Sequence, residues 1–308
     1  MKAAYIEEIG GPEKLIVGER PTPEAGAGQM LVRTKAAGVG PWDRNIMGGM
    51  FGSPSMPLIP GLEVAGIVEQ AGPDAGFTPG DEVFAATGFT AGGFAQYIAM
   101  DPQVAALKPS RLSFEEAAAL VVGGGTAYEG LADVIKLQPG ETVLITAASG
   151  GVGTMAVQIA VALGARVFGV ASARNLEYVR SLGASEVFDY GQPGWAAGVL
   201  EAAPGGVDAL FDGAGGETGQ EALKGIRPGG RGAFIAYPPP QIDPATGITA
   251  EVFNALVNRE RLEAVAALVS GGRLRVELEK VFPLDQAREA LEAVQGGHTR
   301  GKIVLHID

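Results

Sequence analysis

A short loop of small side chains at Ala148–Gly153 is the segment whose residue types and spacing best fit a chemical role, and it reads A-x-G-x-x-G. The apolar, β-branched run Val143–Thr146 before it predicts a buried parallel strand. A helical pattern continues from the loop to Leu163, and Arg166–Ala171 is a second apolar run. Small residues let phosphates approach the backbone, and the N–H groups at a helix N-terminus attract their negative charge. The segment therefore predicts a βαβ unit that binds a dinucleotide, rather than a purely structural turn.

The residues that end the second strand indicate which dinucleotide this unit binds. A site specific for NAD places Asp or Glu about 20 residues beyond the loop to bind the ribose 2′-hydroxyl, but Val170–Asn175 contains no carboxylate. A 2′-phosphate therefore meets no like charge there, and Ser172 and Arg174 offer a hydroxyl donor and a guanidinium. The alternative for Arg174 is a solvated residue at the start of a helix. The pattern favours NADPH over NADH.

Length and composition indicate a two-domain globular protein. The chain has 308 residues, more than a single core usually supports. Its net charge of −12, from 35 acidic and 23 basic residues, includes no long basic cluster and argues against nucleic acid as a main partner. The start lacks the apolar core of a signal peptide, and no unbroken apolar run is long enough to span a membrane. We expect a cytoplasmic protein without a membrane partner.

Residues able to hold a metal are few. The sequence has no cysteine, which excludes disulfides, thiolate zinc sites and a cysteine nucleophile. Its two histidines, His298 and His306, both lie near the C-terminus. One or two histidines with carboxylates would make an unusual transition-metal site. We therefore predict chemistry without a metal, and a surface or strand-end position for both histidines.

The elements around the βαβ unit predict an α/β protein with two kinds of domain. Short strands separated by Gly and Pro fill roughly the first 105 residues and predict an antiparallel, barrel-like domain. Ser113–Glu116 reads as a capping box that opens a helix to Val122, and a second helical run covers Tyr128–Ile135. Strands and helices then alternate from about residue 140 to 257, as a doubly wound parallel sheet requires. Tyr237–Pro240 must be an extended loop, because its prolines fit neither a helix nor a central strand.

Several short motifs, in this order and spacing, give the chain a family resemblance. They are Met1–Ala3, Pro60–Gly66, Pro79–Val83, Gly125–Tyr128, Ala148–Gly153, Val187–Tyr190 and Arg300–Lys302. Over nearly its whole length the chain resembles the zinc-independent branch of the medium-chain dehydrogenase/reductase superfamily, in the quinone oxidoreductase or zeta-crystallin-like group. Zinc-dependent relatives carry a catalytic-loop cysteine and a Pro-Gly-His-Glu motif, where this chain has Val39–Asp43 and Leu62. The four-cysteine lobe of those relatives is absent as well.

The resemblance implies a discontinuous domain arrangement. A GroES-like catalytic domain, mainly β and barrel-like, is expected over residues 1–115 and 258–308. A Rossmann-type NADP-binding domain with a doubly wound parallel sheet is expected over residues 116–257. Members of the family are often dimeric, so we also expect a homodimer.

The same resemblance implies roles for individual cofactor-binding residues. The loop residues expected at the nucleotide are Ser149, Gly150, Gly151, Val152 and Gly153, of which Gly150, Gly151 and Val152 contact the pyrophosphate. Thr126 is expected to approach the nicotinamide ring. Ser172, Arg174 and Tyr190 are expected around the 2′-phosphate of NADPH. Tyr190 has a second interpretation, as a strand-end aromatic that packs on the rim of the sheet.

The substrate side departs from the family pattern. Members commonly have Asn where this chain has Gly40 and often Tyr near the position of Asn45, and both groups are thought to face the substrate. Their absence argues against a strict quinone specificity but not against hydride transfer. Trp42 is either a pocket wall or a core residue. Asp43 is expected to hydrogen-bond locally in a turn rather than act as a general acid, and Tyr237 is a candidate proton donor beside the nicotinamide.

These residues predict a reductase that passes hydride from NADPH to an electron-poor acceptor, either a quinone or an alkene conjugated to a carbonyl. The cofactor supplies the chemistry, and the protein supplies positioning and excludes water. Without a zinc Lewis acid such acceptors are favoured, because backbone N–H groups, a Tyr hydroxyl or water can meet their developing oxyanion. A free-standing enoyl or alkenal double-bond reductase is the alternative within this class. An NADPH-binding redox sensor or structural protein with little turnover is the alternative of another class.

Overall fold

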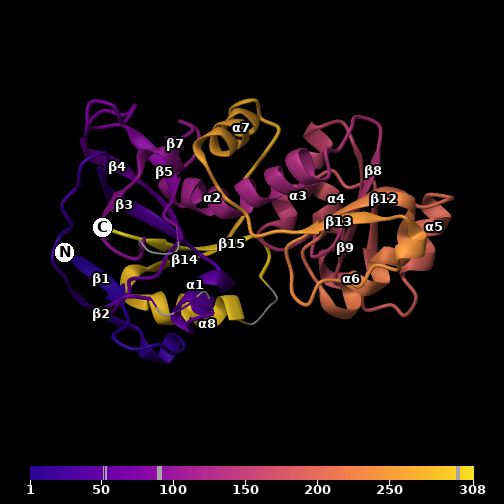
Figure 1. Cartoon of the computed structure of the whole chain (residues 1–308), viewed down its shortest axis with the longest axis horizontal. Helices are drawn as coiled ribbons and strands as arrows, with labels where there is room; N and C mark the ends of the chain where they lie inside the picture. The colour runs from indigo at the N-terminus through magenta and orange to yellow at the C-terminus, as the bar shows by residue number, and fades with distance from the viewer. Residues whose placement is uncertain (51, 53, 89–91, 296–298) are drawn as a thin grey trace. The chain divides into compact units, whose positions relative to one another are not determined.

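Two units are distinct in the computed structural model, which describes residues 1–50, 52, 54–88, 92–295 and 299–308 (Figure 1). Unit 1 consists of Met1–Val122, Val257–Ser270 and Val276–Asp308, and unit 2 of Gly123–Leu256 and Gly271–Arg275. The chain crosses between the units inside helix α2 (Phe114–Tyr128), whereas the sequence interpretation placed this boundary between residues 115 and 116. A change of packing partner inside a helix leaves no turn signal that a sequence could reveal.

The main sheet of unit 1 joins strands from both ends of the chain. Its order is β14-β15-β3-β4-β5-β7, and β6 also pairs with β3. The strands are β3 (Met30–Val39), β4 (Glu63–Ala71), β5 (Glu82–Ala86), β6 (Tyr97–Met100), β7 (Ala105–Leu107), β14 (Leu278–Pro283) and β15 (Lys302–His306). A separate antiparallel pair consists of β1 (Lys2–Tyr5) and β2 (Ile16–Glu19). The last strand, β15, runs antiparallel to β3, with Ile303 opposite Val39, so the C-terminal segment completes the N-terminal sheet.

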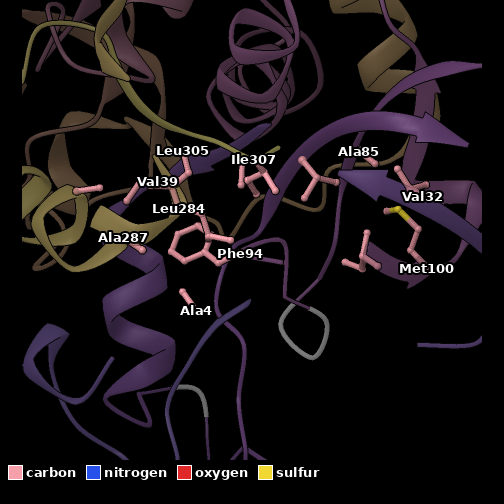
Figure 2. Close-up of a cluster of buried hydrophobic side chains, with 14 of the residues drawn as sticks. Ala4, Val32, Val39, Ala85, Phe94, Met100, Leu284, Ala287, Leu305 and Ile307 are labelled. Carbon is pink, nitrogen blue, oxygen red and sulfur yellow. The ribbon is translucent and has the colours of Figure 1, made fainter. Parts of the chain in front are cut away.

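Apolar side chains from distant parts of the sequence form the core of unit 1 (Figure 2). Phe94 and Leu305 are fully buried in it, with Ala4 from β1 and Leu284 from the segment before α8. The helices of unit 1 are α1 (Pro41–Met47), α2, α7 (Arg259–Ser270) and α8 (Ala287–Gln295). Helix α8 packs against both α1 and β15, which fixes α1 over the sheet. None of the described helices is long and apolar enough to cross a bilayer.

Unit 2 contains the doubly wound sheet that the sequence predicts. Six described strands are all parallel and follow the order β10-β9-β8-β11-β12-β13. They are β8 (Thr142–Ile145), β9 (Arg166–Ala171), β10 (Glu186–Asp189), β11 (Val207–Asp212), β12 (Ile226–Phe234) and β13 (Thr249–Val252), with helices α3 (Gly153–Ala162), α4 (Leu176–Ser181), α5 (Ala196–Ala202) and α6 (Gly216–Ala222). The strand order reverses between β8 and β11, which is where sheets of this kind bind dinucleotides.

Two elements of unit 2 begin where the sequence has turn-forming residues. Strand β12 begins at Ile226 and includes Pro228 and Gly229. Those residues normally mark a turn; here the register between β11 and β12 shifts, so the partner strand accommodates an irregular stretch. Helix α6 starts at Gly216, directly after a glycine-rich loop that hides the helical start from the apolar pattern.

Helix α2 is continuous where the sequence predicts two separate helical runs. It passes through Gly123–Gly125 to Tyr128, and a π-helical segment continues to Val134. Each glycine costs about 1 kcal/mol relative to alanine inside a helix. A Cβ on Gly123, however, would lie only 2.9 Å from the Gly151 carbonyl oxygen, so glycine is needed for this close packing. Tertiary packing therefore outweighs helix propensity at this run.

Candidate active site

The predicted nucleotide loop connects β8 to α3. The Gly150 N–H donates to the Ala147 carbonyl oxygen over 2.9 Å, and Ala147 has a φ of 49°, so the chain turns sharply directly after the strand. A Cβ on Gly153 would overlap the Ala147 carbonyl oxygen and lie 2.8 Å from the Cα of Ala148. Only glycine allows α3 to begin this close to the strand end.

The start of α3 offers unpaired hydrogen-bond donors. Within the part of the chain that the structure describes, the N–H groups of Gly151 and Val152 donate to no backbone acceptor. Both residues are partly exposed. Unpaired N–H groups and the positive end of the helix dipole together attract an anion. The loop therefore fits the pyrophosphate of a nicotinamide dinucleotide.

Helix α2 lies against the same loop. Its closest approach is at Gly123, beside the Gly151 carbonyl and the Met155 side chain. Thr126 lies three residues further along and so projects from the same side of the helix. Its side chain is buried, at 5% exposure. The glycine run thus brings the helix that carries Thr126 up to the nucleotide loop.

Asn175, which the sequence interpretation did not select, joins the loops that follow two neighbouring strands. It is buried, and its Nδ2 donates to Ser149 Oγ over 3.1 Å and to Ser172 Oγ over 3.2 Å. Ser149 belongs to the loop after β8, and Ser172 follows β9. The amide therefore fixes the spacing of two adjacent strand ends. An Asn before a short helix is an ordinary turn or cap residue, so its type alone did not mark it.

The residues expected around the 2′-phosphate lie at neighbouring strand ends. Tyr190 follows β10, and its N–H donates over 3.2 Å to the carbonyl oxygen of Ala171 at the end of β9. The Tyr190 side chain is 44% exposed. Arg174 is exposed and Ser172 is partly exposed. All three are thus accessible at the carboxyl edge of the sheet.

A buried carboxylate that the sequence interpretation missed lies where the strand order reverses. Asp212 ends β11 and is fully buried; its Oδ1 accepts from Thr146 Oγ1 over 2.5 Å, and its Oδ2 accepts the Gly215 N–H over 3.0 Å. Thr146 Oγ1 in turn accepts the Gly213 N–H over 3.0 Å. These bonds hold the loop after β11 against the end of β8. The sequence shows only an acid between an apolar strand and a glycine-rich run, which does not distinguish it from an ordinary strand-end acid.

Tyr237 lies in the loop after β12, at the same edge of the sheet. The Gly216 N–H donates to the Pro238 carbonyl oxygen over 2.9 Å, which ties this loop to the start of α6. The Tyr237 side chain is 66% exposed, so its hydroxyl is open to a ligand.

The three residues expected at the substrate pocket lie at the start of α1 in unit 1. Gly40 is the N-cap residue, and Trp42 and Asn45 are both partly buried, three residues apart on the helix. A Cβ on Gly40 would overlap the Trp42 indole. A side chain at position 40 would therefore require the Trp42 ring to move from its place in this structure.

A buried ion pair supports this end of unit 1. Lys302 Nζ is paired with Glu63 Oε1, and their side chains are 4% and 0% exposed. The second oxygen, Glu63 Oε2, accepts the Val122 N–H of α2 over 3.0 Å. Burial raises the pKa of Glu63, while the ammonium group of Lys302 opposes that shift. The sequence interpretation missed the pair because its members are 239 positions apart.

Asp43 makes the local turn bond that the sequence predicts, with Gly40, and a second bond with Gly61, 18 positions away. Its Oδ2 accepts the Gly40 N–H over 2.8 Å, and its Oδ1 accepts the Gly61 N–H over 3.0 Å. The side chain is fully buried. Burial raises the pKa of Asp43 to about 7, and the negative charge of Glu63 adds to the shift.

The stability conferred by Asp43 is expected to fall as pH rises. Its folded pKa lies above the value of an unfolded chain, so the folded state holds an extra proton between about pH 4 and pH 7. Relative to Asp43→Asn, which does not titrate, the wild-type protein should lose about 1 kcal/mol per pH unit in that window. Calorimetric melting of both proteins from pH 5 to pH 8 measures the difference. A difference that stays constant with pH would show that Asp43 remains charged.

The described residues include no cluster of three or more His, Asp or Glu side chains that could hold a metal. His306 Nδ1 lies 2.7 Å from Glu115 Oε1, and Nε2 lies 3.1 Å from Asp308 Oδ1. Hydrogen bonds with these two carboxylates raise the pKa of His306. The other histidine, His298, lies outside the described residues.

Models of two protein families match the chain. Residues 26–110 match the alcohol dehydrogenase GroES-like domain, and residues 182–305 match a family described as zinc-binding dehydrogenase. The two matches cover parts of both units.

Curated relatives point to reductases of two acceptor types. A quinone oxidoreductase of Pongo abelii is 31% identical, over 99% of this chain and 97% of its own length. An NADPH-dependent alkenal/one oxidoreductase of Arabidopsis thaliana is 30% identical, over 99% of this chain and 79% of its own length. A spectinabilin polyketide synthase protein of Streptomyces orinoci is 36% identical over 92% of this chain, which spans 14% of that relative.

Solved structures agree with the fold along the whole chain. An NAD-dependent alcohol dehydrogenase superposes with a TM-score of 0.94 at 29% identity, with full coverage of both chains. A mycobacterial protein solved in complex with NADPH superposes with a TM-score of 0.88 at 29% identity, over 99% of each chain.

Proposed function

Since this chain belongs to the medium-chain dehydrogenase/reductase superfamily, in its quinone oxidoreductase group, we propose that this oxidoreductase reduces a quinone or an α,β-unsaturated carbonyl with NADPH and without zinc. The observation that carries the proposal is the nucleotide site of unit 2. A phosphate-binding loop is followed there by Ser172 and Arg174, with no acidic residue at the end of β9. A 2′-phosphate is therefore accepted where an NAD site would repel it.

The choice of NADPH is supported by the relatives as well as by the residues. The alkenal/one oxidoreductase of Arabidopsis thaliana is named NADPH-dependent, and the mycobacterial structure contains NADPH. One superposed structure is of an NAD-dependent enzyme, so the fold alone does not decide between the cofactors. Arg174 is the residue through which the choice is tested.

Replacing Arg174 with alanine should raise the Kd for NADPH about 10- to 100-fold and leave that for NADH nearly unchanged. A charge-assisted hydrogen bond to phosphate contributes about 1.5–3 kcal/mol, and only NADPH carries the 2′-phosphate. Calorimetric titration with both cofactors measures the two constants. Arg180→Ala on α4, an exposed residue paired with Glu177, is the matched control and should change neither. An equal loss for both cofactors would place the 2′-phosphate elsewhere.

In the proposed reaction the chain binds and orients the cofactor and the acceptor, and it excludes water. Bound NADPH supplies the hydride. The N–H groups of Gly151 and Val152 hold the pyrophosphate, Thr126 borders the nicotinamide, and Asn175 keeps Ser149 and Ser172 at a fixed spacing. Tyr237 is the proposed proton donor, because its exposed hydroxyl lies at the carboxyl edge of the sheet, where the cofactor binds.

The acceptor is proposed as either a quinone or an enone, and relatives of both names support the class. Neither needs the Lewis acid that reduction of a simple ketone needs. Steady-state comparison of a naphthoquinone with an alkyl enone decides between quinone reductase and alkenal reductase. An NADPH-binding sensor with little turnover is the remaining alternative, and tight NADPH binding without oxidation by any acceptor would favour it.

A further inference from the structure

Two fully buried polar side chains, Thr146 and Asp212, meet where the strand order of unit 2 reverses. Thr146 follows β8 and Asp212 ends β11, and the two strands are paired up to Ile145 and Phe211. Thr146 Oγ1 donates to Asp212 Oδ1 over 2.5 Å. A hydrogen bond to a carboxylate is stronger than one between neutral groups. The Thr146/Asp212 pair thus links the ends of two neighbouring strands through side chains.

The pair also holds the loop that follows β11. Thr146 Oγ1 accepts the N–H groups of Gly213, over 3.0 Å, and of Ala214, over 3.2 Å. Asp212 Oδ2 accepts the Gly215 N–H over 3.0 Å. Three successive N–H groups of the loop therefore donate to these two side chains. The position of this loop relative to β8 depends on the pair.

The loop after β12, which carries Tyr237, is joined to the same arrangement. The Gly216 N–H, directly beyond the loop after β11, donates to the Pro238 carbonyl oxygen over 2.9 Å. Pro238 is the neighbour of Tyr237 in the chain. The loops after β11 and β12 are thus bonded to each other and, through the Thr146/Asp212 pair, to the end of β8.

The phosphate-binding loop after β8 has hydrogen bonds of its own. The Ala148 N–H donates to the Val170 carbonyl oxygen of β9 over 3.0 Å. Asn175 joins Ser149 of the same loop to the end of β9. Neither connection involves the Thr146/Asp212 pair. Loss of the pair therefore leaves these bonds of the phosphate-binding loop in place and frees the loops on the other side of the reversal.

A dinucleotide lies across such a reversal, with one mononucleotide half on each side. The residues proposed for the adenosine 2′-phosphate follow β9 and β10, which leaves the ends of β11 and β12 for the nicotinamide half. We propose that Thr146 and Asp212 are positioning residues that hold the nicotinamide half of the nucleotide site in place relative to the phosphate-binding loop. The proposal rests on the proposed function and deepens it. Both side chains are fully buried, so they act through the two loops and touch no part of the cofactor.

A ligand without nicotinamide distinguishes the two halves of the site. Adenosine 2′,5′-bisphosphate carries the 2′-phosphate and the adenosine only. In Thr146→Val, which removes the hydroxyl and keeps the size of the side chain, the Kd for NADPH should rise about tenfold, while that for the bisphosphate stays within about twofold. The anisotropy of reduced-nicotinamide emission at saturating NADPH should also fall, because the ring is held less firmly. Calorimetric titration measures both constants, and neither measurement requires turnover.

Further variants separate positioning from a general loss of structure. Thr146→Ser keeps the hydroxyl and should restore the affinity and the anisotropy. Asp212→Asn, which removes the charge, should change both in the same direction as Thr146→Val. Thr142→Val at the other end of β8 is the matched control, because the backbone N–H that donates there to Asp208 Oδ2 over 2.8 Å is kept; it should change neither. Asn175→Ala, on the adenosine side, should weaken the binding of both ligands.

The outcomes separate the role of the pair from the proposed function. Equal weakening of both ligands in Thr146→Val would overturn the proposal, because a general loss of structure acts on both halves. Unchanged affinities and unchanged anisotropy would overturn it as well and leave the proposed function standing. If the wild-type protein prefers NADH, the same comparison with NADH and ADP tests the pair, so a wrong choice of cofactor is told apart from a wrong role. Binding of neither dinucleotide would refute both.

Discussion

Replacing Glu63 with alanine is expected to lower the free energy of unfolding by about 3–5 kcal/mol, the usual effect of removing one partner of a buried ion pair. The substitution leaves the Lys302 ammonium buried and unpaired, since that side chain is 4% exposed. It also removes the acceptor of the Val122 N–H, inside helix α2. The loss should appear as a melting temperature several degrees lower, measured by calorimetry.

A second carboxylate on the same strand provides the control. Glu69 also lies on β4 and pairs with Arg33 over 2.6 Å, but both side chains are about one-third exposed. Exposed ion pairs contribute about 0–1 kcal/mol, so Glu69→Ala should be nearly neutral. Equal effects of Glu63→Ala and Glu69→Ala would show that the pair with Lys302 is solvated and contributes no more than a surface contact.

Replacing Gly153 with alanine should weaken NADPH binding by about 100-fold or more. The added Cβ would overlap the backbone of Ala147, which a side-chain rotation cannot relieve. The loop must then shift, and the N–H groups of Gly151 and Val152 lose their position at the pyrophosphate. Two hydrogen bonds to a charged group, at about 1.5–3 kcal/mol each, account for a loss of this size.

Calorimetric titration with NADPH measures the effect, with circular dichroism as a check that the variant is folded. Gly72→Ala is the matched control, because a Cβ at Gly72 meets no atom within 4 Å; it should bind NADPH like the wild-type protein. Unaltered affinity in Gly153→Ala would show that the nucleotide phosphates do not bind at this loop.

The parts of the fold that depend on local sequence could be predicted from it. The strand at 166–171 has the expected bounds, because an apolar run between Gly and polar residues defines it locally. The capping box at Ser113 forms in both directions, with bonds of 2.8 Å and 3.1 Å to Glu116. Such signals require only a few neighbouring residues.

The parts that depend on distant contacts could not be predicted. Pairing of Glu63 with Lys302 requires the C-terminal strand to return to the N-terminal sheet, and neither residue type marks that return. Asp212 reads as an ordinary strand-end acid until the sheet places Thr146 beside it. Asn175 likewise acquires its role only when the ends of two strands lie side by side. In each case tertiary structure, and not local pattern, selects the residue.

The most direct test of the proposed function is the oxidation of NADPH by metal-stripped protein, followed at the absorbance of the reduced nicotinamide with a naphthoquinone or an alkyl enone as acceptor and NADH as the control. We expect turnover with at least one acceptor that prefers NADPH and is unaffected by a chelator. No turnover after metal removal that returns when zinc is added, or turnover that prefers NADH, would contradict the account.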